Sequence, residues 1–167
     1  MDETSLPFRA KGEPVRPGRS HDGKPPLAGA VEIEGEGPGR VRLAVIGDHA
    51  AESPGGFVAG DVAGGGTVVS DGWPGYGRPK DVEHDPRVIG DAPAHLVLPW
   101  IHRVFANARR WALGVHHGLR SAHLRAYPDE FVFRLDRRHD PAAAFERLLG
   151  LGLTLQPATY QMLIRRS

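Results

Sequence analysis

Residues 94–115 read AHLVLPWIHRVFANARRWALGV, the stretch with the most sustained helical pattern in the chain. Its apolar residues recur at the spacing of one helix face, which predicts an amphipathic helix lying on a core. Pro99 suits the first position of a helix, and Gly114 offers a place to end it. The predicted apolar face consists of Trp100, Ile101, Val104, Phe105, Ala108, Trp111, Ala112 and Val115.

Two polar residues lie on one edge of this predicted helix. His102 and Arg109 are seven positions apart, so they lie within roughly 20° of each other, just off the apolar face. Asn107 lies on the opposite border. A histidine and an arginine on one edge of a packed helix suggest part of a site assembled across the fold. The alternative is a satisfied surface histidine beside a solvated arginine.

The composition is that of one globular domain. The chain has 167 residues, of which 40% are hydrophobic and 25% charged, which allows a single core and argues against general disorder. It contains no cysteine, which excludes disulfides, a thiol nucleophile and cysteine-bound zinc. No apolar run reaches the roughly 18 residues of a membrane span, and the start MDETSLPFR does not resemble a signal peptide. We therefore expect a cytoplasmic protein without a membrane partner.

Charge is unevenly distributed along the chain. Residues 1–99 contain 10 Lys and Arg against 15 Asp and Glu, whereas residues 100–167 contain 11 against 5. A basic C-terminal third is what a surface facing nucleic acid needs, because neutralising phosphates dominates such binding. Proteins that never bind nucleic acid can also divide their charge in this way.

The remaining pattern predicts one domain, 1–167, with four parts: mostly loop at 1–26, a sheet region at 27–93, a helical part at 94–150 and a tail at 151–167. Residues 27–33 and 40–46 alternate in polarity around a glycine-rich turn, which predicts an antiparallel hairpin. A short helix is expected within 48–62, and short strands at 67–70 and 88–90. Further helices are predicted at 121–134, broken at Tyr127 by the following proline, and at 141–149.

Asp71 follows the predicted strand 67–70 directly. Ligand sites in α/β sheets concentrate at the carboxyl ends of strands, so Asp71 is a candidate site residue. It could equally be the residue that opens an Asp-Gly turn. His116 and His117 are expected in a solvated turn, because adjacent side chains on a helix diverge by about 100° and no acidic partner has ligand spacing.

Seven segments in order resemble the catalytic domain of bacterial insertion-sequence transposases of the ISXO2-like group. They are MDETSLPFR, RSHDGKPPLAGAVE, GPGRVRLAVI, TVVSDGWPGY, HLVLPWIHRVFANARRWALGVHHG, HLRAYPDEFVFRLDRR and AAAFERLLG. The resemblance implies an α/β, ribonuclease-H-like fold, a mixed sheet flanked by helices. It also implies an enzyme that cuts and joins DNA at the ends of a mobile element.

The same resemblance implies a catalytic, metal-binding set of Asp2, Asp71 and His102. Relatives often carry glutamate at the third position, followed seven residues later by Lys or Arg, and this spacing favours His102 over Asn107. Two carboxylates and an imidazole would hold Mg²⁺ or Mn²⁺ for two-metal phosphodiester chemistry.

DNA is the implied partner, and a homo-oligomer is a further expectation. The expected phosphate-binding residues are Arg103, Arg109, Arg110, Arg120 and Arg125. Trp73 and Tyr76 are candidates either for stacking on an unpaired base or for core packing.

Two departures from the family shape the functional expectation. Relatives have an N-terminal DNA-recognition region before the segment MDET, and they place the first aspartate on the first strand of the sheet. We therefore expect an N-terminally truncated remnant with its first strand missing and Asp2 on a fraying end. It would be either a transposase catalytic domain or a non-enzymatic DNA-binding remnant. A weaker alternative is a small metal nuclease in which Glu52 or Asp48 replaces Asp2.

Overall fold

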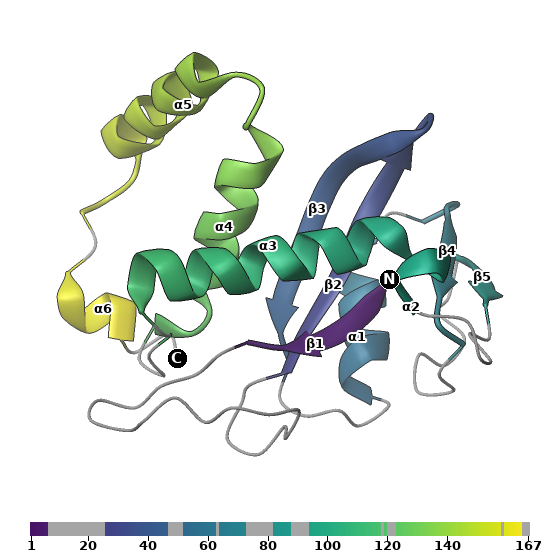
Figure 1. The fold of residues 1–167 in the computed structure, drawn as a ribbon. Helices are drawn as coiled ribbons and strands as arrows, with labels where there is room; N and C mark the ends of the chain where they lie inside the picture. The colour runs from purple at the N-terminus through teal and green to yellow at the C-terminus, as the bar shows by residue number, and fades with distance from the viewer. Residues whose placement is uncertain are drawn as a thin grey trace.

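The computed structural model describes residues 1–6, 26–46, 52–62, 64–72, 82–87, 94–117, 119, 123–157 and 159–164. Antiparallel and parallel strands are flanked by helices, which is the expected mixed α/β class and is compatible with a ribonuclease-H-like fold (Figure 1). In chain order the elements are β1 (Asp2–Ser5), β2 (Pro26–Glu34), β3 (Gly37–Val45), α1 (Glu52–Asp61), β4 (Thr67–Ser70), β5 (Glu83–Pro86), α2 (Ala94–Val97), α3 (Pro99–His116), α4 (Ala126–Asp136), α5 (Pro141–Thr154) and α6 (Tyr160–Ile164).

The predicted hairpin is confirmed as β2 and β3. The two strands pair antiparallel from Leu27 opposite Val45 to Glu34 opposite Gly37, with an irregular step between Val31 and Ile33. Gly35 turns the chain at φ 60°, a left-handed conformation that glycine adopts without strain. Strong alternation and a glycine turn therefore specified this part of the sheet.

The first strand of the sheet is present, which corrects the expectation that it would be missing. β1 pairs antiparallel with β2, from Asp2 opposite Gly29 to Ser5 opposite Pro26. The Met1 nitrogen also donates a hydrogen bond to the Val69 carbonyl oxygen at 2.7 Å, which joins the start of β1 to β4. These neighbours satisfy backbone groups of a polar segment that has little strand propensity of its own. Asp2 is therefore held within a sheet.

β4 and β5 form a parallel pair in which Val68 lies opposite His84. The strand 67–70 was expected, but β5, with the sequence EHDP, was not. Its residues are polar and end in proline, so no alternation marks them as a strand. The strand predicted at 88–90 lies outside the described residues.

Side chains along β2 alternate between two cores, one on each face of the sheet. Leu27, fully buried, belongs to the core that α3 and α4 cover, whereas its neighbour Ala28 belongs to the core that contains Phe57 and Val58 of α1. Figure 1 shows α3 crossing the near side of the sheet, with α1 behind it. The fold is therefore a sheet between helices.

α3 confirms the amphipathic helix over most of its predicted length. Pro99 is its first residue, and a separate short helix, α2, precedes it because proline disfavours a helical residue before it. His117 ends α3 in the left-handed conformation at φ 52°. Val115, predicted to be buried, is 57% exposed. The buried residues are Ile101, Val104, Phe105, Ala108 and Ala112.

α3 approaches the sheet closely at Gly29. A Cβ atom at this position would lie 2.7 Å from Phe105 Cε1 and 2.8 Å from Ile101 Cδ1, both side chains of α3. Real Cβ atoms essentially never show such distances. Because Gly29 has no side chain, α3 can pack this closely on β2. Gly29 is also the register partner of Asp2, so the close approach occurs next to Asp2.

α4 corrects the expectation of a helix broken at Tyr127. It is one continuous helix from Ala126 to Asp136, and Pro128 lies in its first turn. Backbone N–H groups of a first turn have no partner within the helix, so proline is tolerated there. At its other end, the Asp136 carboxylate accepts a hydrogen bond from the Val41 nitrogen at 3.0 Å, which attaches α4 to β3.

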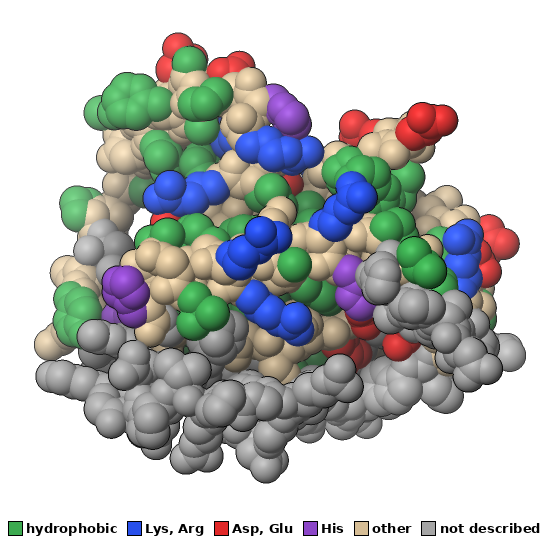
Figure 2. Space-filling model, in the orientation of Figure 1, with side chains coloured by type: hydrophobic (Ala, Val, Ile, Leu, Met, Phe, Trp, Pro, Cys, Tyr) green, Lys and Arg blue, Asp and Glu red, His purple; other side chains and the backbone are tan. Residues whose placement is uncertain are grey.

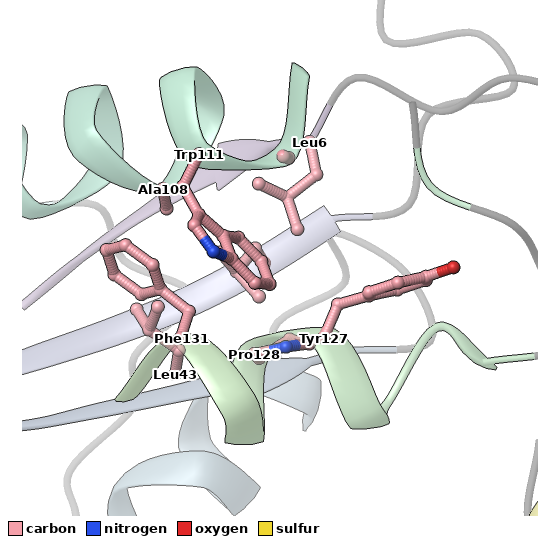
Figure 3. Close-up of a pocket in the computed structure, with 9 residues that line it drawn as sticks. Leu6, Leu43, Ala108, Trp111, Tyr127, Pro128 and Phe131 are labelled. Carbon is pink, nitrogen blue, oxygen red and sulfur yellow. The ribbon is translucent and has the colours of Figure 1, made fainter. Parts of the chain in front are cut away.

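α3, α4 and the sheet enclose the small apolar pocket of Figure 3. Trp111 of α3 lies there between Leu6, Tyr127 and Phe131, with the indole ring 5.5 Å from the Phe131 ring. Such an arrangement is core packing between α3 and α4. The surface that lines the pocket is apolar.

α5 stands apart from the sheet in Figure 1, and none of its described residues is buried. It begins as predicted, with Pro141 at its start and the Asp140 carboxylate accepting a hydrogen bond from the Ala143 nitrogen at 2.9 Å. It is followed by α6, which the sequence pattern did not predict. Within the part of the chain that the structure describes, no helix has the length and apolar character needed to cross a bilayer.

Candidate active site

Asp2, Asp71 and His102 belong to three different elements. Asp2 begins β1, Asp71 follows the last residue of β4, and His102 is in the first turn of α3. The Met1–Val69 hydrogen bond brings the first two segments side by side. Figure 2 shows histidine and acidic side chains next to each other beneath the first half of α3, close to a row of basic side chains.

His102 and Asp2 are in direct contact. The His102 Nε2 atom lies 3.5 Å from the Asp2 Oδ2 atom, and the two side chains are 28% and 15% exposed. Among the described residues this Nε2 atom is buried and has no hydrogen-bond partner. A buried imidazole nitrogen beside a carboxylate, without a hydrogen bond of its own, is an arrangement that fits a metal ligand.

Burial raises the pKa of the Asp2 carboxyl above its ordinary value, because water is removed from its charged form. The Glu3 backbone N–H, which donates to Asp2 Oδ1 at 2.8 Å, and the nearby His102 both lower this pKa. The negative charge of Asp71 raises it again, so the two carboxyls are close enough to interact. A cation between them would relieve both the repulsion and the burial penalty.

The structure thus places His102 in contact with Asp2, and Asp71 within electrostatic reach of Asp2. Within the described ranges, no three His, Cys, Asp or Glu side chains are arranged closely enough to enclose a metal ion. Asp2 is the common member of both interactions. Asp2 therefore interacts with each of the other two candidates, but the three side chains do not surround a single point.

Residues 1–136 match the family described as ISXO2-like transposase domain. The chain belongs to this family. The match covers β1 through α4 and includes all three candidate residues, whereas α5 and α6 lie beyond it. No curated protein and no solved structure matches the chain.

Arg109 of this transposase domain faces the sheet. Its guanidinium donates hydrogen bonds to the hydroxyl of Thr4 and, at 3.4 Å, to the carbonyl oxygen of Ser5. Thr4 is only 6% exposed. The residue expected to contact DNA therefore also holds the end of β1 against α3, two residues from Asp2.

Three of the other arginines expected to bind DNA lie on the surface of the transposase domain. Arg103 is exposed and places its guanidinium 4.7 Å from the centre of the Trp100 ring. Arg110 is exposed and donates to the Asn107 side-chain oxygen at 3.3 Å. Arg125, exposed, precedes α4. Arg120 lies outside the described residues.

The alternative site residues have different surroundings. Asn107, the other candidate for the third ligand, is exposed and engaged by Arg110. Glu52 begins α1, and its side chain is not among those described. Asp48, Trp73 and Tyr76 lie outside the described residues. The contact with Asp2 is therefore made by His102.

His116 corrects the expectation of a solvated turn. Its ring centre lies 4.8 Å from the ring centres of Trp111 and Tyr127, and its Nε2 atom lies 3.9 Å from Glu130 Oε2. It therefore joins α3 to α4. His117, the next residue, is exposed as expected.

Ser70 and His84 were not identified from the sequence. The Ser70 hydroxyl, fully buried, lies 2.8 Å from His84 Nε2 and accepts a hydrogen bond from the Gly72 nitrogen at 3.2 Å. Because β5 has no strand pattern, nothing in the sequence indicated that His84 would contact Ser70, the residue before the candidate Asp71.

Proposed function

We propose that this transposase domain cuts and joins DNA by metal-dependent phosphodiester chemistry, with Asp2, Asp71 and His102 as the metal-binding and catalytic residues. The observation that carries the proposal is the contact between His102 and Asp2, with Asp71 near enough to affect the pKa of Asp2. These residues come from three separate elements. The start of a strand, the end of another strand and the first turn of a helix supply them, all within the part of the chain that matches the transposase family.

The donor set suits Mg²⁺ or Mn²⁺. Carboxylate oxygens are the hard ligands that Mg²⁺ prefers, and an imidazole nitrogen makes Mn²⁺ an equally suitable ion. Bound divalent ions supply activation of the attacking oxygen and stabilisation of the leaving oxygen. The role of the chain is to hold Asp2 desolvated and oriented by the Glu3 N–H, and to hold His102 beside it.

DNA is the proposed partner, in keeping with the cytoplasmic location expected from the sequence. Exposed arginines at positions 103, 110 and 125 are available to phosphates. Figure 2 shows basic side chains spread over α3 on the same side of the molecule as the candidate site. Arg109 is proposed to add positive electrostatic potential at this surface while it donates a hydrogen bond to Ser5 of β1.

The test is nicking of element-end DNA in the presence of Mg²⁺ or Mn²⁺. We expect the parent chain to nick and the variants Asp71→Ala and His102→Ala to lose the activity. Glu146→Gln on exposed α5 is the matched acidic control and should keep it. Equal nicking by Asp71→Ala and the parent would refute the proposed site.

DNA binding without catalysis is the second candidate function. It is favoured by the arrangement of the described residues, in which no three ligand side chains surround one point. It predicts strongly salt-dependent DNA binding that needs no metal and survives Asp71→Ala. Nicking that depends on Asp71 would exclude it.

We also propose that α5 pairs with α5 of a second copy. Phe145, Leu148 and Leu149 share one face of the helix and are 63%, 53% and 53% exposed. An isolated helix of this length is only marginally stable in water. No charged residue lies on this face between Phe145 and Leu149, so a second copy related by a two-fold axis would cover it with matching apolar side chains.

A further inference from the structure

We propose that His84 is a positioning residue for Asp71 and acts through the Ser70 hydroxyl. The inference rests on the proposed function, because it concerns how one of the proposed metal ligands is held. It assigns a role to β5, the strand that no sequence pattern marked. His84 itself touches no reacting group in this proposal.

The link between His84 and Ser70 crosses the parallel pair of strands. Val68 lies opposite His84 in the register, and Ser70 is two residues further along β4, so its side chain is on the same face as that of Val68. His84 therefore reaches diagonally to Ser70, and its Nε2 atom lies 2.8 Å from the hydroxyl oxygen. The serine side chain is completely buried, which removes water as a competing partner.

The Ser70 hydroxyl also controls the turn that contains Asp71. It accepts the Gly72 N–H at 3.2 Å, so one oxygen atom joins the residue before Asp71 to the residue after it. The Ser70 carbonyl is held separately, by the Arg87 nitrogen at 2.9 Å. Gly72 adopts φ 82°, a conformation that side chains disfavour. Hydrogen bonds from His84 of β5 and from Arg87, the residue after β5, thus fix the position of Ser70, and Ser70 in turn holds Gly72.

This constraint matters because Asp71 must stand close to Asp2. Two buried or partly buried carboxyls repel each other, and the charge of Asp71 already acts on Asp2. A shift of the turn backbone would move the Asp71 side chain relative to Asp2. The hydrogen bond between His84 and Ser70 opposes that movement. Residues that hydrogen-bond to a metal ligand or its neighbours generally orient the ligand in this way.

The experiment uses the full chain and measures Mn²⁺ binding without DNA, from the electron paramagnetic resonance signal of free Mn²⁺. We expect His84→Ala to weaken Mn²⁺ binding about tenfold, as loss of an outer partner typically does. His84→Gln should restore most of the affinity, because its side-chain amide can either donate to the Ser70 hydroxyl or accept from it. His139→Ala, at an exposed turn position, is the matched control and should bind like the parent.

A second variant and a second measurement separate positioning from general stability. Ser70→Ala should weaken Mn²⁺ binding as much as His84→Ala, and the double variant should be no weaker than either single one. Amide hydrogen exchange of Gly72 should be about two- to tenfold faster in His84→Ala than in the parent or His84→Gln. Thermal unfolding checks that each variant is folded.

The outcomes distinguish this proposal from the proposed function. If Asp71→Ala loses Mn²⁺ binding but His84→Ala and Ser70→Ala bind like the parent, the role of His84 is refuted and the site stands. If Asp71→Ala itself binds Mn²⁺ like the parent, the proposed site is refuted. In that case the exchange rate of the Gly72 amide decides the role of His84. An unchanged rate in His84→Ala would refute the positioning role as well, whereas a faster rate would show that His84 stabilises the turn.

Discussion

The Nε2 atom of His102 lies 3.5 Å from the Oδ2 atom of Asp2, although the two residues belong to the third helix and the first strand. The contact exists because α3 packs directly on β2 at Gly29, the register partner of Asp2. Arg109, two turns further along α3, donates to Thr4 and Ser5 of the same strand. Helix and strand are therefore tied at two points, and the candidate site lies at one of them.

Replacing His102 by glutamate should make the fold depend on a divalent ion. Two carboxylates at this distance repel each other, so the metal-free variant should unfold at a lower temperature, by about 2–4 °C for each kcal/mol lost. Mg²⁺ should restore the transition more effectively than in the parent, because a carboxylate is a harder ligand. Thermal unfolding with and without Mg²⁺ measures this. Asn107→Glu on the exposed side of α3 is the control, and an equal response there would contradict the choice of His102.

Replacing Asp2 by asparagine should stabilise the metal-free protein at neutral pH. Burial raises the pKa of Asp2, so its charged form is less favourable in the folded than in the unfolded chain. This penalty applies above the raised pKa, declines as the pH falls through it, and vanishes below the unfolded value of 3.8. Urea unfolding should therefore show the largest gain near pH 7 and none near pH 3. A loss of stability at pH 7 would contradict the burial argument.

Gly29→Ala should destabilise the fold by roughly 1–3 kcal/mol, as overpacking in a core typically does. The added methyl group would lie within 2.9 Å of Leu43 Cδ2 and closer still to two side chains of α3. Gly56→Ala is the matched control, because a Cβ at Gly56 of α1 meets no atom within 4 Å. Urea unfolding compares the two. Similar stabilities would show that α3 can move away from β2 without loss.

Arg109→Ala and Arg103→Ala should have different effects. Loss of Arg109 removes hydrogen bonds to β1 and should lower the free energy of unfolding by about 1 kcal/mol. Loss of exposed Arg103 should leave the free energy of unfolding unchanged. It should reduce the slope of the logarithm of the DNA-binding constant against the logarithm of salt concentration by about 1, the value for one phosphate contact. Urea unfolding and DNA titrations at several salt concentrations measure both. The reverse pattern would assign Arg109 to DNA alone.

Introducing charge on the apolar face of α5 should prevent self-association. Leu148→Glu places a carboxylate within the face formed with Phe145 and Leu149, where pairing with a second copy would bury it. Light scattering after size-exclusion chromatography should change from dimer to monomer. Thr154→Glu, on the opposite side of the helix, is the control and should remain dimeric. A parent chain that is monomeric at high concentration would refute the pairing.

Part of the site was accessible from sequence because the family resemblance pointed to Asp2, Asp71 and His102. Spacing alone placed His102 on the edge of a buried helix. It could not show that Asp2 is in a strand, because DETS acquires strand structure from β2 and from Val69. It also could not show His84, because EHDP becomes a strand through pairing with β4.

The sequence by itself determined the elements with a strong internal period: the hairpin of β2 and β3, the strand β4, and α3 with proline at its start. Such elements carry their own signal, because side-chain alternation or a helical apolar face records which side will be buried. The tertiary structure decided the strands β1 and β5, the unbroken α4 and the engagement of Arg109 with β1. These depend on backbone and side-chain partners contributed by distant segments, and no local pattern can encode a partner that is brought near only by folding.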